Sequence, residues 1–123
     1  IMENRQALKL IEKIQKELFK DNFEVSEIVT DLKKLREITL ELNNPVVTKA
    51  LRLAYEHLEN NNGFFIGIPD DEPIDSKDAE LEVKISDENN VESFNYFLSL
   101  LTDLEKKNNV LDLKEYNKAF LAY

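Results

Sequence analysis

The sequence contains no cysteine, and this absence excludes several kinds of chemistry at once. Without thiols the chain cannot form disulfides, thiolate metal sites or iron–sulfur clusters, and it has no cysteine nucleophile. A small domain without disulfides must be stabilised by its own packing, which fits a reducing compartment. We therefore expect a cytoplasmic protein.

Glycine and proline are also scarce, with 2 and 3 residues in a chain of 123. So few turn-forming residues favour long helices over many short strands. No run of about 18 consecutive apolar residues is present, so the sequence predicts no transmembrane helix. The N-terminal residues lack the basic and apolar regions of a secretory signal. Ile1 before Met2 is interpreted as a residue left by cloning, so a signal peptide could also have been removed.

The composition that is present suits a single folded domain over residues 1–123. Apolar residues make up 42% of the chain and charged residues 33%, which is enough to bury a core. The formal net charge of -9 argues against a nucleic-acid partner, because phosphate binding needs a surplus of lysine and arginine. We expect neither a nucleic-acid nor a membrane partner.

Apolar residues recur at three- and four-residue steps in several segments, which predicts a mainly α fold. We expect an antiparallel bundle of about five helices, the last of which opens near Asp112. The expected helices cover residues 4–19, 25–42, 45–60, 89–104 and 112–123.

Asparagine clusters supply the boundary signals that glycine does not. Asn44 is expected to cap the third helix, with Pro45 at its first position and Gly63 at its end. Asn89 with Glu92 three residues later has the spacing of a capping box for the fourth helix. The short joint between the second and third helices predicts a helical hairpin.

Residues 64–85 follow a different pattern. Phe64 to Ile68 are apolar and β-prone, while Leu81, Val83 and Ile85 alternate with charged residues. This pattern favours a short β-hairpin. The alternative is an extended arm whose apolar residues lie on the bundle.

The negative charge is concentrated in residues 64–90, which we call the acidic connector. It holds nine acidic and two basic residues, so it carries -7 of the net charge of -9. The connector does not match an EF-hand loop, because Pro73 lies within it and the central glycine is missing. A weak cation site formed by Asp70, Asp71 and Asp75 stays open as an alternative.

His57 is the only histidine. Because Leu58 takes the core direction, we expect His57 at the flank of its helix, making a surface hydrogen bond. No partner for a catalytic triad can be argued from spacing, and glycine-rich phosphate loops are absent. We expect no catalytic residue, no cofactor and no metal ligands, and the sequence favours a protein that is not an enzyme.

The best functional hypothesis is a small non-catalytic protein–protein interaction module that uses a helical groove or its acidic connector. One alternative is an inhibitor or immunity-type protein whose acidic arm blocks a basic cleft, and another is a small enzyme with a pocket between helices near His57. We expect another protein as partner, with a basic protein or a second copy as options. The candidate interaction residues are Asp70, Asp71, Glu72 and Asp75 in the connector, and Leu40 and Tyr55, which fall off the apolar stripes.

Overall fold

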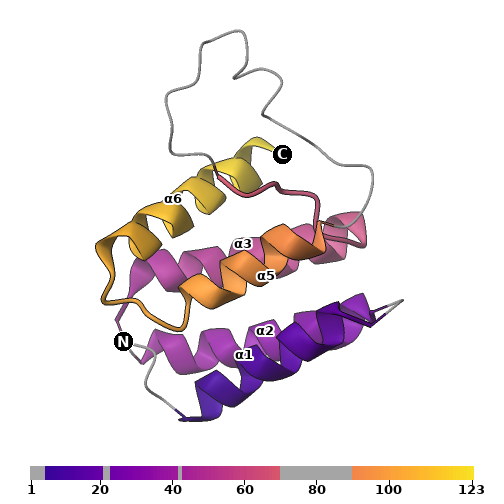
Figure 1. The fold of residues 1–123 in the computed structure, drawn as a ribbon, viewed down its shortest axis with the longest axis horizontal. Coiled ribbons are helices and arrows are strands. Elements are labelled where there is room, and N and C mark those ends of the chain that lie inside the picture. The colour runs from indigo at the N-terminus through magenta and orange to yellow at the C-terminus, as the bar shows by residue number, and fades with distance from the viewer. Residues whose placement is uncertain (1–4, 21–22, 42, 70–89) are drawn as a thin grey trace, which may run out of the picture.

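The computed structural model describes residues 5–20, 23–41, 43–69 and 90–123, and these ranges are mainly helical (Figure 1). The predicted helical bundle is therefore confirmed. The helices are α1 (Arg5–Leu18), α2 (Val25–Leu40), α3 (Pro45–Asn61), α5 (Val91–Leu100) and α6 (Lys107–Ala122). Within these ranges, no helix combines the length and the apolar character that a membrane span requires.

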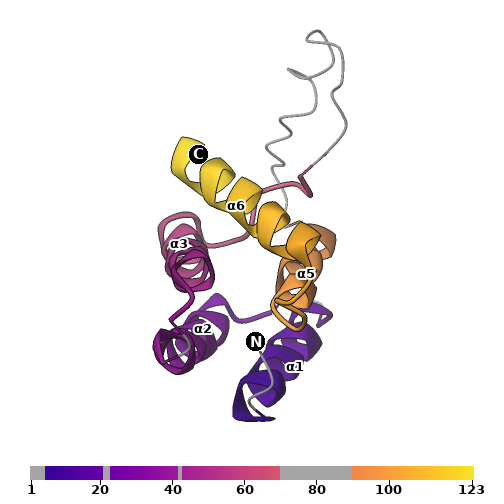
Figure 2. The same cartoon turned by 90° about the vertical axis from the view of Figure 1, so that its left-hand side faces the viewer.

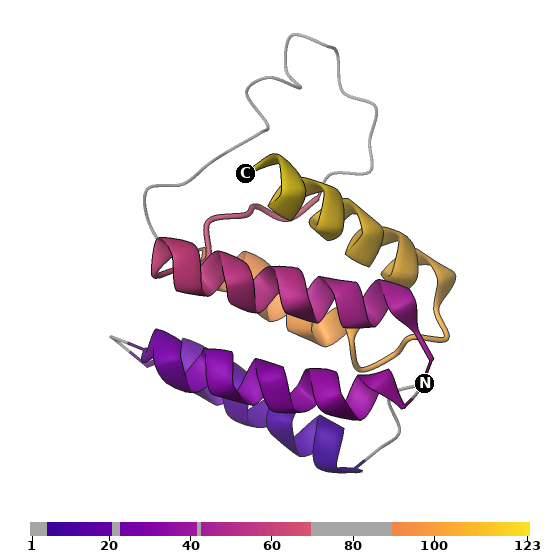
Figure 3. The same cartoon turned by 180° about the vertical axis from the view of Figure 1, so that it is seen from behind.

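The helices close into a ring in which each one packs against two neighbours. The packed pairs are α1–α2, α2–α3, α3–α6, α6–α5 and α5–α1. Figure 2 shows this arrangement with α2 and α3 seen nearly end-on, and Figure 3 shows α2 and α3 as an antiparallel hairpin. The apolar stripes of all five helices face the inside of the ring and form one core.

Asparagine side chains and backbones set the ends of α3, as the sequence predicts. The Asn44 side chain accepts a hydrogen bond from the Val47 N–H at 3.4 Å, and Pro45 occupies the first turn. The end of the helix differs from the prediction in one respect. Asn62, and not Gly63, adopts the left-handed conformation with φ 56°, because asparagine tolerates this region better than most residues.

The boundaries of the last two helices also differ from the prediction. Helix α5 is capped by Asn90, which accepts from the Ser93 N–H at 3.0 Å, while Asn89 lies outside the described residues. It ends at Leu100, and Leu101 and Leu104 are buried within the following turn instead of extending the helix. Helix α6 begins at Lys107, so Asp112 does not open it.

The predicted β-hairpin is not supported, because residues 64–69 form no strand and the described part of the chain contains none. Phe64 and Ile66 are buried against the helices, so their apolar side chains are satisfied by packing without a β-ladder. The Phe64 carbonyl accepts a hydrogen bond from the Asn90 N–H at 2.7 Å. The expected second arm, 81–85, lies outside the described residues.

Phe64 lies at the centre of an aromatic cluster inside the ring. Its side chain is fully buried and stacks on Phe94, with ring centroids 4.4 Å apart and planes inclined by 10°. Phe120 meets it edge-on, at 5.7 Å and 88°. Since α5 and α6 contribute these rings, Phe64 connects the chain that leaves α3 to both C-terminal helices. The cluster comprises Phe64, Phe94, Phe97, Tyr116 and Phe120.

Truncating Phe64 is expected to destabilise the whole ring. Phe64→Ala should lower the free energy of unfolding by about 4 kcal/mol, because it leaves a cavity between three elements. The matched control is Phe19→Ala, at a side chain that is 66% exposed, which should change the value by no more than about 0.5 kcal/mol. Urea unfolding followed by circular dichroism measures both. Equal losses in the two variants would contradict the central role of Phe64.

Candidate functional site

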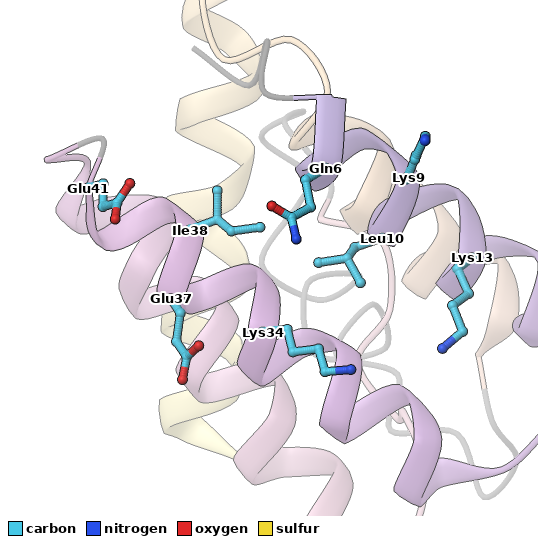
Figure 4. A pocket seen from close by; sticks show the side chains of 8 residues that line it. All are labelled: Gln6, Lys9, Leu10, Lys13, Lys34, Glu37, Ile38 and Glu41. Atoms are coloured by element: carbon cyan, nitrogen blue, oxygen red, sulfur yellow. The ribbon is translucent and has the colours of Figure 1, made fainter.

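A surface groove of about 550 Å³ runs between α1 and α2 (Figure 4). We call it the α1–α2 groove. Four lining residues come from α1 and four from the end of α2 and the residue after it, so neither helix forms the site alone. The lining residues are Gln6, Lys9, Leu10 and Lys13 from α1, and Lys34, Glu37, Ile38 and Glu41 from the end of α2 and the residue that follows it.

The helical repeat places these side chains beside the core and not inside it. In α1 the core positions include Ile11 and Ile14, so Leu10 lies on the flank of the buried stripe. In α2, Ile38 likewise comes directly before a buried residue, Thr39. Leu10 and Ile38 are both half-buried and pack against the core, and they form an apolar floor between the two helices.

The charged residues of the groove are separated along its length. In Figure 4, Lys13 and Lys34 extend toward one end, and Glu37 and Glu41 lie toward the other. The antiparallel course of α1 and α2 produces this separation, since it brings Lys13 of one helix toward Lys34 of the other. The groove therefore has a basic end, an apolar centre and an acidic end.

One ion pair holds the two helices together beside the groove. The Lys13 Nζ lies 3.1 Å from the Asp31 Oδ2, and Asp31 is buried. Lys9 and Lys34, in contrast, make no ion pair or hydrogen bond with any residue of the described ranges. These two ammonium groups keep their hydrogen-bonding capacity for water or for a ligand.

Leu40 and Tyr55, the two described candidates from the sequence, do not share a surface patch. Leu40 is 50% exposed at the end of α2, whereas Tyr55 is half-buried in α3, with the Lys33 Nζ 5.3 Å from the centre of its ring. Of two apolar residues near them in the sequence, Leu53 is buried, and Ile38 is half-buried and lines the α1–α2 groove. The other four candidates, Asp70, Asp71, Glu72 and Asp75, lie outside the described residues.

The sequence predicts a helical groove but not which helices form it, although one signal was present. Leu10 and Ile38 are apolar residues adjacent to a helical stripe, and such flanking positions often face a neighbouring helix. Which helix that neighbour is cannot be read from either segment alone. The pairing of α1 with α2 in space supplies this information.

His57 is buried in the core, with 5% exposure, and is not on the surface flank where the sequence places it. Helix α3 packs against α2 on one side and α6 on the other, so its buried face is wider than a single stripe predicts. The His57 Nε2 accepts a hydrogen bond from the Phe65 N–H at 3.0 Å. The Nδ1 lies 3.3 Å from the Asn61 amide, and the edge of the ring meets Tyr123.

Burial lowers the pKa of His57 to about 4, so the imidazole is neutral at pH 7. Because Nε2 accepts from the Phe65 N–H, the single proton of the neutral ring is on Nδ1. The Nε2 is therefore engaged within the protein, and His57 does not line the α1–α2 groove. This geometry gives no support to a small enzyme that uses His57 as a base.

Two tyrosine hydroxyls form hydrogen bonds between α5 and α6. The Tyr116 hydroxyl donates to the Ser93 carbonyl at 2.9 Å, and the Tyr96 hydroxyl donates to Asp112. Burial raises the pKa of Tyr116 well above its usual range, so the hydroxyl stays protonated and keeps donating. These hydrogen bonds position one helix against the other and leave no free acid or base.

The described residues contain no group of three or more histidine, aspartate and glutamate side chains that could hold a metal ion. The cation alternative at Asp70, Asp71 and Asp75 falls outside these residues. Compared with family models, curated proteins and solved structures, the chain matches none of them. The α1–α2 groove is therefore the feature of the described residues that bears on function.

The buried state of His57 predicts a pH dependence of stability. The ordinary pKa is 6.5 and the folded value is about 4, so the unfolded chain binds more protons between these values. The free energy of unfolding should therefore fall by about 3 kcal/mol as the pH drops through this range. His57→Gln keeps an acceptor for the Phe65 N–H but does not titrate, so it should remove this part of the pH dependence.

Urea unfolding of both proteins at several pH values from 7 to 4 measures the difference. The matched control is Asn61→Ala, which leaves the imidazole and its Phe65 hydrogen bond in place and should keep the pH slope. If wild type and His57→Gln lose stability with the same slope, His57 is not a buried neutral group.

Proposed function

We propose that this protein is a small, non-catalytic interaction module that binds a partner protein through the α1–α2 groove. The observation that carries this proposal is the apolar floor formed by Leu10 and Ile38, bordered by the ammonium groups of Lys9 and Lys34, which pair with no residue among those that the structure describes. An apolar centre with a polar rim is the usual anatomy of a protein interface. A cytoplasmic setting is part of the proposal and is supported by the absence of cysteine.

The size and shape of the groove support a side-chain ligand. Its volume of about 550 Å³ suits a few side chains of a peptide or of a partner helix. Grooves between two helices commonly receive an apolar face whose anchors repeat at helical spacing. The eight lining residues of the α1–α2 groove provide such a surface.

The groove is also preformed. The Lys13–Asp31 ion pair joins α1 to α2, and the Gln15 amide donates to the Asn95 side chain of α5 at 3.1 Å. Helix α1 is thus held on both sides. A partner that binds a preformed surface loses less free energy to ordering than one that must assemble it.

A photo-crosslinking experiment tests the site. A benzoylphenylalanine replaces Glu37, on the wall of the groove, and the matched variant carries it at Lys114, an exposed position on α6. Irradiation in cells should give a specific protein adduct from the Glu37 position, because a bound partner lies within reach there. The Lys114 position should give none.

Adding Leu10→Asp to the Glu37 variant should abolish the adduct, since a carboxylate on the floor opposes burial of an apolar anchor. The adducts are identified by mass spectrometry. The same adducts from both labelled positions, or adducts insensitive to Leu10→Asp, would show that the groove is not the binding site.

A second candidate function is inhibition of a basic protein by the acidic connector. The charge of -7 between residues 64 and 90 favours it, as does the Phe64–Asn90 hydrogen bond, which holds the two ends of the connector together on the ring. The contact residues would be Asp70, Asp71, Glu72 and Asp75.

Neutralising these four carboxylates to the matching amides should abolish capture of a basic partner on an affinity column, because the attraction is electrostatic. The melting temperature should hardly change. The control removes four carboxylates outside the connector at exposed positions, which are Glu12, Glu27 and Glu92 on helices and Glu105 between α5 and α6. Capture that depends equally on both sets would assign it to net charge and not to the connector.

A further inference from the structure

We propose that the α1–α2 groove binds an acidic segment of a partner protein in one direction. An apolar side chain of that segment lies between Leu10 and Ile38, and its acidic side chains lie toward Lys13 and Lys34. This inference rests on the proposed function and adds to it the chemistry of the partner and its orientation.

The first observation is the charge of α1. The helix carries four basic and two acidic residues, so it is net positive in a chain whose net charge is -9. All four basic residues are exposed, and two of them, Lys9 and Lys13, line the groove. The basic surface is therefore local and faces the place where a ligand would bind.

The second observation concerns the partners of the lysines. Lys9 and Lys34 have no ion-pair or hydrogen-bond partner in the part of the chain that the structure describes. Lys13 is paired with Asp31, but its side chain is 63% exposed, and an ammonium group has three donors. An incoming carboxylate at this end can therefore bind without breaking the contact between α1 and α2.

The third observation is the acidic end of the groove. Glu37 and Glu41 would repel a polyanion that lay along the whole groove. Nucleic acids and anionic membranes present phosphates at every position, so they meet this repulsion. A peptide can confine its carboxylates to one end and place an apolar residue over the floor. The groove therefore favours a protein segment, and the charge separation defines its direction.

These contributions have different roles in binding. Burial of an apolar side chain between Leu10 and Ile38 supplies affinity, while the exposed lysines increase the association rate and exclude the reversed orientation. Because rim charges are screened by salt, binding should weaken as ionic strength rises.

Peptide display on the full chain tests the proposal. Random dodecapeptides on phage are selected against the immobilised protein, and the enriched sequences are synthesised and measured by fluorescence anisotropy. We expect an apolar residue with acidic residues on one side of it, and binding that weakens with salt.

Charge reversal of the two lysines that have no partner among the described residues then tests the attraction to an acidic peptide. Lys9→Glu/Lys34→Glu should raise the Kd of these peptides by about tenfold. The control, Lys49→Glu/Lys114→Glu, makes the same change of net charge at exposed positions of α3 and α6 and should change the Kd by less than about twofold. Equal effects in the two variants would overturn the proposal.

The floor variants Leu10→Asp and Ile38→Asp separate this proposal from the proposed function. Peptides that lose binding in these variants but show no acidic bias would overturn the acidic partner and leave the groove as a binding site. Enriched peptides that still bind the floor variants would overturn both. Circular dichroism confirms that each variant is folded, and either floor variant suffices if the other unfolds.

A nucleic acid or a second copy of the chain in the α1–α2 groove would each give a distinct result in binding measurements on these variants. A fluorescent single-stranded oligonucleotide that binds the wild type but not Lys9→Glu/Lys34→Glu would replace the protein partner with nucleic acid. A dimer in sedimentation velocity that disappears in Leu10→Asp would assign the groove to a second copy of the chain. Either result overturns the inference.

Discussion

The hydrogen bond from the Asn90 N–H to the Phe64 carbonyl is the constraint on which the ring depends. It joins the chain that leaves α3 to the residue that caps α5, so the exit of one helix and the start of another share one point. Phe64 adds a stacked contact with Phe94, the first aromatic ring of α5. These contacts place α5 against α1 and leave α6 to close the ring on α3. The orientation of α1, and with it the groove, follows from this closure.

The groove illustrates how a surface site can be formed from residues that narrowly miss the core. Leu10 and Ile38 are each next to a fully buried position, and the spacing between α1 and α2 leaves them half-covered. The ion pair of Lys13 with Asp31 keeps this spacing at the basic end. A small change in the angle between the two helices would bury the floor or separate its halves. Leu10 and Ile38 are accessible in the groove because of where α1 and α2 place them in the ring, and not because of their residue types.

The sequence could predict what depends on local interactions. The five helices follow from apolar periodicity, and Asn44 caps α3 through atoms only three residues apart. The prediction failed where residues far apart in the sequence determine which side chains are buried and where a helix ends. His57 is buried because α6 covers a second face of α3, and Leu101 can leave the helix because it is still buried, together with Leu104, in the turn after α5. The groove could not be predicted for the same reason, since its two walls belong to different helices whose pairing no single segment specifies.

The closed junction at Phe64 and Asn90 also has an evolutionary consequence. Because the Asn90–Phe64 hydrogen bond fixes the two ends of the intervening chain to each other, a change in the length of that chain alters the entropy of closing the loop. Doubling such a loop costs only about 0.6 kcal/mol. The closure term of insertions and deletions within the acidic connector should therefore be small. On this term alone, the connector can change in length while the α1–α2 groove stays unchanged, so the two proposed recognition surfaces could evolve at independent rates.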